Sequence, residues 1–260
     1  MAVAVRLAAT DMDAVQVAWV RRAGSFLLLL AATRGRGLRP RRENWVQVAL
    51  RGVLGASSLT LYYVAVAWAG AGLGTLLHCT YPVWTALWVA RRAGRGIGRR
   101  VLVALALNFA GAAVALGPNV AMGSSVRLGG IVALVAGMLA GGAVATAGEL
   151  RQSESTTLVT TWFMGTGAVL LLPSLAMGGP PLTAPLAGAL FAVVVTSMIG
   201  QLLLHHGLGT VSATAGALAT ATSTITAALA EAALYGTSIP PRMLVAGVFM
   251  LGAVWLVGRR

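Results

Sequence analysis

The chain alternates between long apolar runs and short polar segments rich in glycine, proline and arginine. Each run is close to the roughly 20 residues that a helix needs to cross a hydrocarbon layer of about 30 Å. Residues 1–10 are apolar but too short to cross, and we interpret them as the end of a first helix. The pattern predicts nine complete spans, over residues 14–32, 45–67, 72–90, 101–117, 129–148, 156–174, 184–206, 211–234 and 241–258.

Residues 55–92 form a predicted transmembrane hairpin whose turn, residues 68–74, consists mainly of small residues and carries no charge. Both open ends of the hairpin carry arginine, in the segment 34–42 on one side and from Arg91 onward on the other. By the positive-inside rule the open ends are cytoplasmic and the turn faces outward. Continuing this alternation places the C-terminal pair, Arg259 and Arg260, in the cytoplasm.

The composition agrees with a multi-pass helical membrane protein. Of the 260 residues 58% are hydrophobic and 10% are charged, and the mean hydropathy is +0.84. The 19 basic residues exceed the six acidic ones, but they fall mainly in the gaps between apolar runs. We therefore expect them to set topology and contact anionic lipid headgroups, and we expect no nucleic-acid partner because no basic segment is interleaved with aromatic residues.

An internal repeat appears when the chain is shifted against itself by 142 residues. Leu76 then falls on Leu218, and residues 85–87 fall on residues 227–229. Each half contains five predicted helices, and an odd number of crossings forces the second half to insert upside down relative to the first. The predicted domains are a first repeat, 1–117, with an incomplete first helix, and an inverted second repeat, 118–260.

In the same register the helix predicted over 129–148 should pair with a first helix that begins about 13 residues before Met1, so roughly the first two-thirds of that first helix is absent from the sequence. Either the true start lies upstream of Met1, or part of the helix has been lost, or residues 1–10 are a disordered tail.

Several local motifs carry a resemblance to a known family. They are an arginine in the second helix (Arg21 or Arg22), the sequence Tyr62-Tyr63-x-Ala65, a fourth helix centred on Pro82, the segment 200–209, and the closing pair Gly247 and Gly252. Over essentially its whole length the chain resembles the EamA-type proteins of the drug/metabolite transporter superfamily. The resemblance implies an all-α bundle of ten helices that moves a small metabolite, often an amino acid, outward across the plasma membrane by alternating access.

The chain departs from the family pattern at three places. Gly94-Arg95 and Gly236-Thr237 stand where the family usually has Gly-Glu, and Thr224 replaces an expected proline. A divergent, truncated paralogue that does not transport is therefore the alternative to an active transporter.

Arg21 and Arg22 lie about ten ångströms inside the membrane, counted from the outer face. An arginine at the bilayer centre costs about 2.5–3.5 kcal/mol, so at least one of the two should face the interior of the bundle. There it would act as a fixed cation for an anionic substrate group, or it would pair with Glu231. Glu231 might instead bridge to Arg242, which would be a purely structural pair.

Other polar and aromatic residues within the spans are further candidates. His78 is either a proton-coupling group or a hydrogen-bonded packing residue, whereas Gln201 is expected to donate into a cavity because an amide in mid-span needs a partner. His205 and His206 fall at the cytoplasmic boundary, where we expect no functional role. The predicted substrate-binding set is Arg21, Arg22, His78, Tyr81, Trp84, Trp162 and Gln201.

Two other functional classes fit the sequence less well. Membrane-embedded enzymes need clustered Asp or His residues, which six scattered acids and three histidines do not supply. A channel would need a charged ring or a filter-like loop, and the sequence contains neither.

The sequence predicts no disulfide, because it has a single cysteine, Cys79, and no metal or cofactor, because no residues have metal-ligand spacing. The expected partners are a small-molecule substrate and the bilayer, and the oligomeric state is left between monomer and homodimer.

Overall fold

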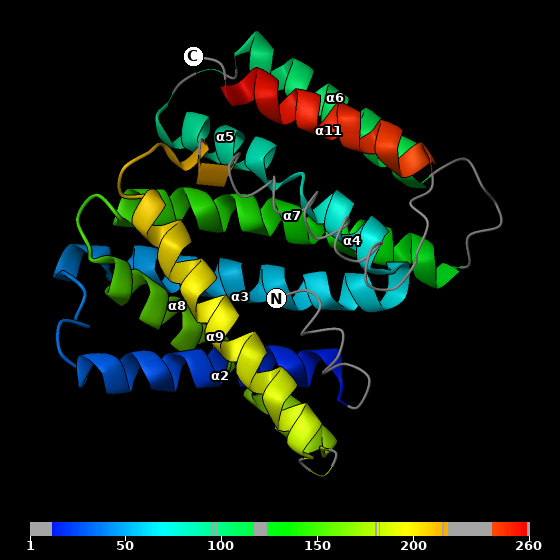
Figure 1. Ribbon diagram of the computed structural model, residues 1–260. Coiled ribbons are helices and arrows are strands. Elements are labelled where there is room, and N and C mark those ends of the chain that lie inside the picture. Colours follow the sequence, from blue (N-terminus) through cyan, green and yellow to red (C-terminus); the bar gives the residue numbers. More distant parts are fainter. Residues whose placement is uncertain are drawn as a thin grey trace. The chain divides into compact units, whose positions relative to one another are not determined.

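The computed structural model describes residues 12–94, 96, 98–116, 124–179, 181, 183–214, 216–217 and 241–258. Within these residues the chain is helical, with short connections and no β-strand (Figure 1). The elements are α2 (Ala14–Thr33), η1 (Arg42–Asn44), α3 (Trp45–Ala69), α4 (Ala71–His78), α5 (Tyr81–Arg92), α6 (Arg99–Leu116), α7 (Ser124–Leu150), α8 (Thr156–Leu170), η2 (Leu172–Met177), α9 (Ala184–Gly207) and α11 (Pro241–Gly258).

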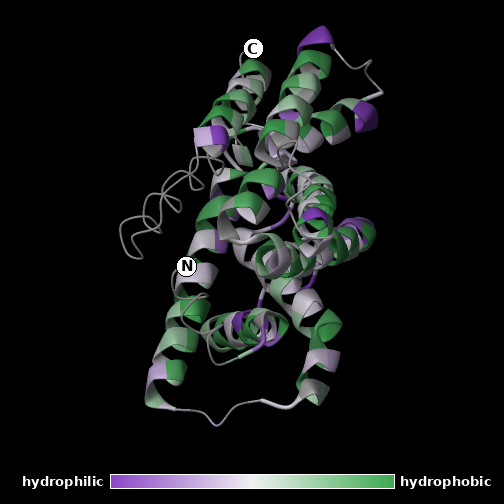
Figure 2. Cartoon of the chain, turned by 90° about the vertical axis from the view of Figure 1, so that its right-hand side faces the viewer, coloured by the Kyte–Doolittle hydropathy of each residue, from purple (hydrophilic) through white to green (hydrophobic). Residues whose placement is uncertain are grey.

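The described helices overlap the predicted spans wherever the structure describes them, which confirms the prediction of a helical membrane protein. Four of them, within α2, α3, α7 and α9, are long and apolar enough to cross a membrane. Figure 2 shows that hydrophobic residues predominate along the helices. Residues 1–10, most of the span predicted over 211–234, and Glu231 lie outside the described residues.

The span predicted over residues 72–90 is divided into two shorter helices, α4 and α5. The division falls at Cys79 and Thr80, just before Pro82 at the start of α5. Pro82 has no N–H to donate to the carbonyl of His78, so the helical hydrogen-bond pattern cannot continue through this point. The hydrophobic pattern does not reveal this break because the segment is long enough and apolar enough to be one span.

Contact clustering divides the chain into two compact units. Unit 1 contains Met1–Thr60 and Thr146–Val211, and unit 2 contains Leu61–Ala145 and Ser212–Arg260. Each unit therefore takes segments from both of the predicted repeats. The repeats concern similarity along the chain, whereas the units concern packing, so the predicted division at residue 117 stays a prediction.

In unit 1, α2 packs against α8, α9 and η2, and α9 runs obliquely across α2 and α8 (Figure 1). Side chains cap the helix starts: Asp13 accepts a hydrogen bond from Val15 N, and Ser155 accepts one from Leu158 N. The apolar core between α2 and α9 is formed by Val17, Leu186, Leu190 and Val193.

In unit 2, α6 and α11 lie side by side, and α4 and α5 pack against α6 (Figure 1). The helix α7 approaches the break between α4 and α5 closely at Gly137. A β-carbon there would lie 2.6 Å from Thr80 Oγ1 and 2.8 Å from the carbonyl oxygen of His78. Small residues allow helix backbones to approach in this way in membrane proteins.

Candidate functional site

Arg21 and Arg22 are both buried inside unit 1, with 2% and 0% of their surface exposed. Arg21 Nε donates a hydrogen bond to Ser197 Oγ on α9. Arg22 donates through Nη1 to the carbonyl of Phe163, at 3.0 Å, and through Nη2 to the carbonyl of Gly55, at 3.1 Å. The two arginines therefore link α2 to α3, α8 and α9 through polar contacts.

A third buried arginine, Arg51 on α3, lies beside this pair. It is 4% exposed, and its Nη2 lies 3.0 Å from Nε2 of His205. Its guanidinium carbon lies 3.9 Å from the ring centroid of Phe163, and that of Arg22 lies 4.3 Å from the same centroid. Phe163 is thus an aromatic ring shared by two cations, an arrangement that is attractive because the ring face is electronegative.

Arg51 was missed in the sequence, although a signal was present. The residue lies inside the span predicted over 45–67, where an arginine is as costly as Arg21 or Arg22. The pairing with His205 could not be recognised from the sequence, because the two residues are 154 positions apart along the chain.

His205, which the sequence places at the cytoplasmic boundary, is fully buried. An arginine has donors only, so Arg51 donates to His205 Nε2, and the ring proton is on Nδ1. Nδ1 then donates to Thr160 Oγ1 at 2.7 Å, and that hydroxyl donates to the carbonyl of Thr156 at 2.8 Å. This chain of hydrogen bonds holds His205 neutral and fixes one tautomer.

Two glycines make room for the buried guanidinium groups. A β-carbon on Gly55 would overlap Arg51 Nη1 and the Phe163 ring, and one on Gly167 would overlap the side chain of Arg22. Both positions lie within regular helices, α3 and α8. The helices are therefore shaped around the arginines, and no larger residue fits at either point without displacing them.

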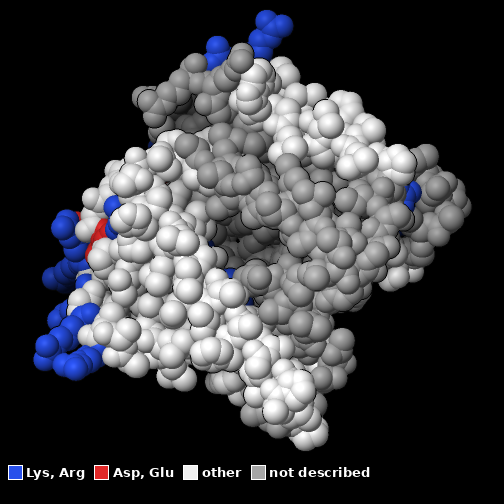
Figure 3. All heavy atoms as spheres, viewed as in Figure 1, with Lys and Arg blue, Asp and Glu red and all other residues white. Residues whose placement is uncertain are grey.

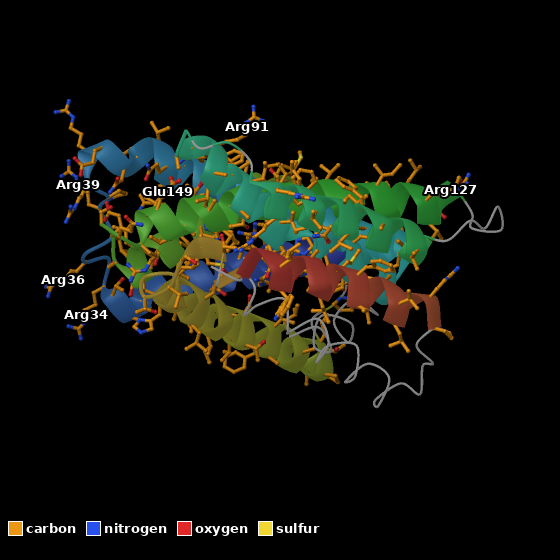
Figure 4. All side chains as sticks on the ribbon, turned by 90° about the horizontal axis from the view of Figure 1, so that it is seen from above. Arg34, Arg36, Arg39, Arg91, Arg127 and Glu149 are labelled. Carbon is orange, nitrogen blue, oxygen red and sulfur yellow. The ribbon has the colours of Figure 1, made fainter. Side chains whose placement is uncertain are left out.

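Charged residues gather at the end of unit 1 where α2 leads into α3. Arg34, Arg36 and Arg39 lie exposed there, as the basic atoms over this segment in Figure 3 and the labelled side chains in Figure 4 show. Glu154 closes the same end, since its Oε1 accepts from the backbone N–H of Arg41 at 2.8 Å and from Asn44 Nδ2 at 2.7 Å.

Arg151 connects this charged end to the buried cluster. Its Nε donates to the carbonyl of His205 at 2.8 Å, and Nη1 donates to the carbonyl of Glu154. Partial burial lowers the pKa of the Arg151 guanidinium group below its usual value, because burial disfavours the charged form. A continuous series of polar contacts therefore runs from Glu154 through His205 to Arg51.

Two other predicted residues also lie in unit 1. Trp162 Nε1 donates to the carbonyl of Leu38 at 2.7 Å. The rings of Trp162 and Trp45 pack in a T-shaped arrangement with their centroids 5.1 Å apart. Trp162 therefore anchors the charged end. Gln201 lies on α9 one turn from both Ser197 and His205, on the same face. Its Oε1 is buried and has no hydrogen-bond partner among the described residues.

The remaining predicted residues, His78, Tyr81 and Trp84, belong to unit 2. The ring centroid of His78 lies 4.7 Å from that of Tyr62 and 5.8 Å from that of Tyr81. Tyr81 donates its hydroxyl to the carbonyl of Ala217 at 3.1 Å, and Trp84 meets Phe109 edge-on at 6.0 Å. The predicted substrate-binding set thus forms two groups, a cationic one in unit 1 and an aromatic one around His78 in unit 2.

The described part of the chain holds no group of three or more His, Cys, Asp or Glu residues that could bind a metal ion.

The full sequence matches a family model, that of the EamA-like transporter family, over residues 1–117 and 127–259. The chain belongs to this family. The resemblance stated from local motifs is confirmed, and so are membership of the superfamily and a role in transport.

Individual proteins agree with the family assignment. The pseudopaline exporter CntI of Pseudomonas aeruginosa strain UCBPP-PA14 is 25% identical over 211 residues, which are 81% of this chain and 74% of that protein. The exporter of the same name from strain PAO1 gives the same values. A solved crystal structure with 16% identity superposes with a TM-score of 0.69 and covers 99% of this chain and 91% of its own. The EamA chain therefore has the fold of a helical membrane transporter bundle.

Proposed function

We propose that this EamA protein is a secondary transporter that exports a small organic metabolite across the plasma membrane by alternating access. The observation that carries the proposal is the family match, which extends over 1–117 and 127–259, together with similarity to an exporter over 81% of the chain. The buried arginines of unit 1 support it, because a charge at membrane depth is retained mainly where it serves a pathway or a binding site.

We propose substrate contacts for each unit separately. In unit 1, Arg21 and Arg22 supply positive charge and Gln201 supplies an amide, while Trp162 anchors the charged end. In unit 2, Tyr81 and Trp84 supply apolar ring surface. Polar groups of the first kind fix the orientation of a ligand, and aromatic rings of the second kind form the walls of ligand sites.

The proposed orientation puts the charged end of unit 1 in the cytoplasm. This end carries Arg34, Arg36 and Arg39, which the positive-inside rule assigns to the inner face. In unit 2, Arg91 at the end of α5 and Arg127 near the start of α7 lie apart (Figure 4). They are proposed to face the cytoplasm and the outside, respectively, and the C-terminus is proposed to be cytoplasmic.

The test compares the metabolites released by cells that produce the protein with those released by cells that produce an unrelated membrane protein at the same level. We expect at least one small metabolite to rise in the medium and to fall inside the cell. Purified protein in liposomes should then carry that compound with saturable kinetics. A compound that is chemically altered would indicate an enzyme, and identical media together with inactive liposomes would indicate the non-transporting alternative.

A further inference from the structure

Arg51 is a buried cation whose charge has no acidic partner among the described residues. Its contacts are the imidazole of His205 and the ring of Phe163, both of which are neutral. Its Nε is buried and has no hydrogen-bond partner in the described part of the chain. A buried charge in such surroundings is costly unless an anion compensates it.

One edge of the Arg51 guanidinium group carries an N–H without a partner in the described part of the chain. This is the N–H of Nε, and the neighbouring Nη2, which lies against His205, carries two hydrogens. An Nε–H and an Nη2–H together form an edge of a planar group at the spacing that matches the two oxygens of a carboxylate. His205, which is fixed by Thr160, holds the guanidinium group in place through Nη2.

We propose that this edge of Arg51 binds a carboxylate group of the transported metabolite. The proposal rests on the proposed transport function and adds to it a residue and the chemical class of the cargo. Gln201 lies one turn before His205 on the same face of α9, and its partnerless Oε1 accepts a hydrogen bond from a hydroxyl or amino group next to that carboxylate. Arg51 is therefore the primary anion contact, and Gln201 selects for a neighbouring donor.

The second cation at Phe163 strengthens the site. Arg22 lies over the same ring as Arg51, and both guanidinium groups reach Gly55, one through a hydrogen bond and the other through close packing. A bound carboxylate lowers the electrostatic energy of both cations in surroundings of low dielectric constant. One bidentate edge suits a carboxylate, whereas a phosphate needs donors to three or four oxygens.

The cytoplasmic side of the proposed site is closed by Arg151, whose Nε is bonded to the His205 carbonyl, and by Glu154, which is bonded to Arg41 and Asn44. In this closed state Arg51 is 4% exposed. Opening these contacts gives a cytoplasmic solute access to the site, which is the side from which an exporter must load its cargo.

The test measures binding to the purified full-length protein in lipid nanodiscs, by the ligand-dependent shift of the melting temperature. The probes are sodium lactate, its neutral analogue lactamide, and sodium phosphate at equal ionic strength. Lactate carries a carboxylate next to a hydroxyl. We expect lactate to raise the melting temperature and lactamide not to. Arg51→Gln should weaken the apparent lactate affinity by about tenfold or more, as expected for a lost charge-assisted hydrogen bond.

Two further variants keep the result interpretable. Arg39→Gln, which removes an exposed arginine of the same unit, should bind lactate like the wild type. Gln201→Leu should reduce the preference for lactate over propionate, which lacks the hydroxyl. The proposal is overturned if lactamide stabilises as well as lactate, if phosphate alone stabilises, or if Arg51→Gln binds lactate normally. If one of these results is obtained but the protein still exports a metabolite, the proposed transport function stands and only the Arg51 site is refuted.

Discussion

The side chain of Arg22 on α2 occupies the space that a side chain at Gly167 on α8 would fill. A β-carbon there would overlap Cδ, Cζ and Nη1 of the arginine, which is fully buried. We predict that Gly167→Ala displaces Arg22 from the carbonyls of Phe163 and Gly55 and lowers the free energy of unfolding by about 1–3 kcal/mol. Thermal unfolding in detergent measures this change.

The control for Gly167 is Gly200→Ala on α9, where an added β-carbon meets no atom within 4 Å. Alanine also has the higher helix propensity, by up to about 1 kcal/mol, so this variant should be as stable as the wild type or more so. Equal melting temperatures for the two alanine variants would show that Arg22 is not tightly packed at Gly167.

Glu154 ties the segment between α2 and α3 to the segment between α7 and α8. Its carboxylate accepts hydrogen bonds from Arg41 N and Asn44 Nδ2 and is 8% exposed. We predict that Glu154→Ala costs about 1–3 kcal/mol, because it leaves both donors without their acceptor. The loosened segment should also be cleaved faster by trypsin after Arg34 or Arg36 in nanodiscs.

Glu43→Ala is the matched control, because Glu43 is an exposed acid in the same segment. It removes the same charge without removing a buried acceptor, and its cleavage rate should equal that of the wild type. If Glu154→Ala were cleaved no faster than Glu43→Ala, Glu154 would not hold this segment.

The helix α7 packs closely against the break between α4 and α5 at Gly137. A β-carbon at this position would lie 2.8 Å from the carbonyl oxygen of His78, a backbone atom that cannot move without shifting α4. We predict that Gly137→Ala lowers the free energy of unfolding by about 1–3 kcal/mol. Gly252→Ala on α11 is the control within the same unit, because it meets no atom within 4 Å. A Gly137→Ala protein as stable as this control would show that α7 does not press on the break.

The helices were predictable because each apolar run has the length that a bilayer requires, and polar residues mark the ends. The break at Thr80 was not, because a proline such as Pro82 is compatible with a kinked continuous helix as well as with two separate helices. The burial of Arg22 followed from the energetic cost of a charge at membrane depth. Its contacts did not follow, because they depend on which faces of α3 and α8 are turned toward it.

The last prediction separates the two roles that the sequence leaves open for Arg22. As a fixed cation for cargo, its charge matters more than its two hydrogen bonds to the carbonyls of Phe163 and Gly55. Arg22→Lys, which keeps the charge, should then retain most of the export. Arg22→Gln should lose about tenfold or more and yet fold at least as well, because a costly buried charge is gone.

If Arg22 instead served as the partner of Glu231, Arg22→Gln would leave a carboxylate buried without compensation and would destabilise the protein. Adding Glu231→Gln would then restore stability and export together, because the two residues act as one unit. Melting temperatures and initial export rates of the two single variants and the double variant form a complete cycle. A double variant that is stable but still inactive supports the role in cargo binding, whereas one that recovers export refutes it.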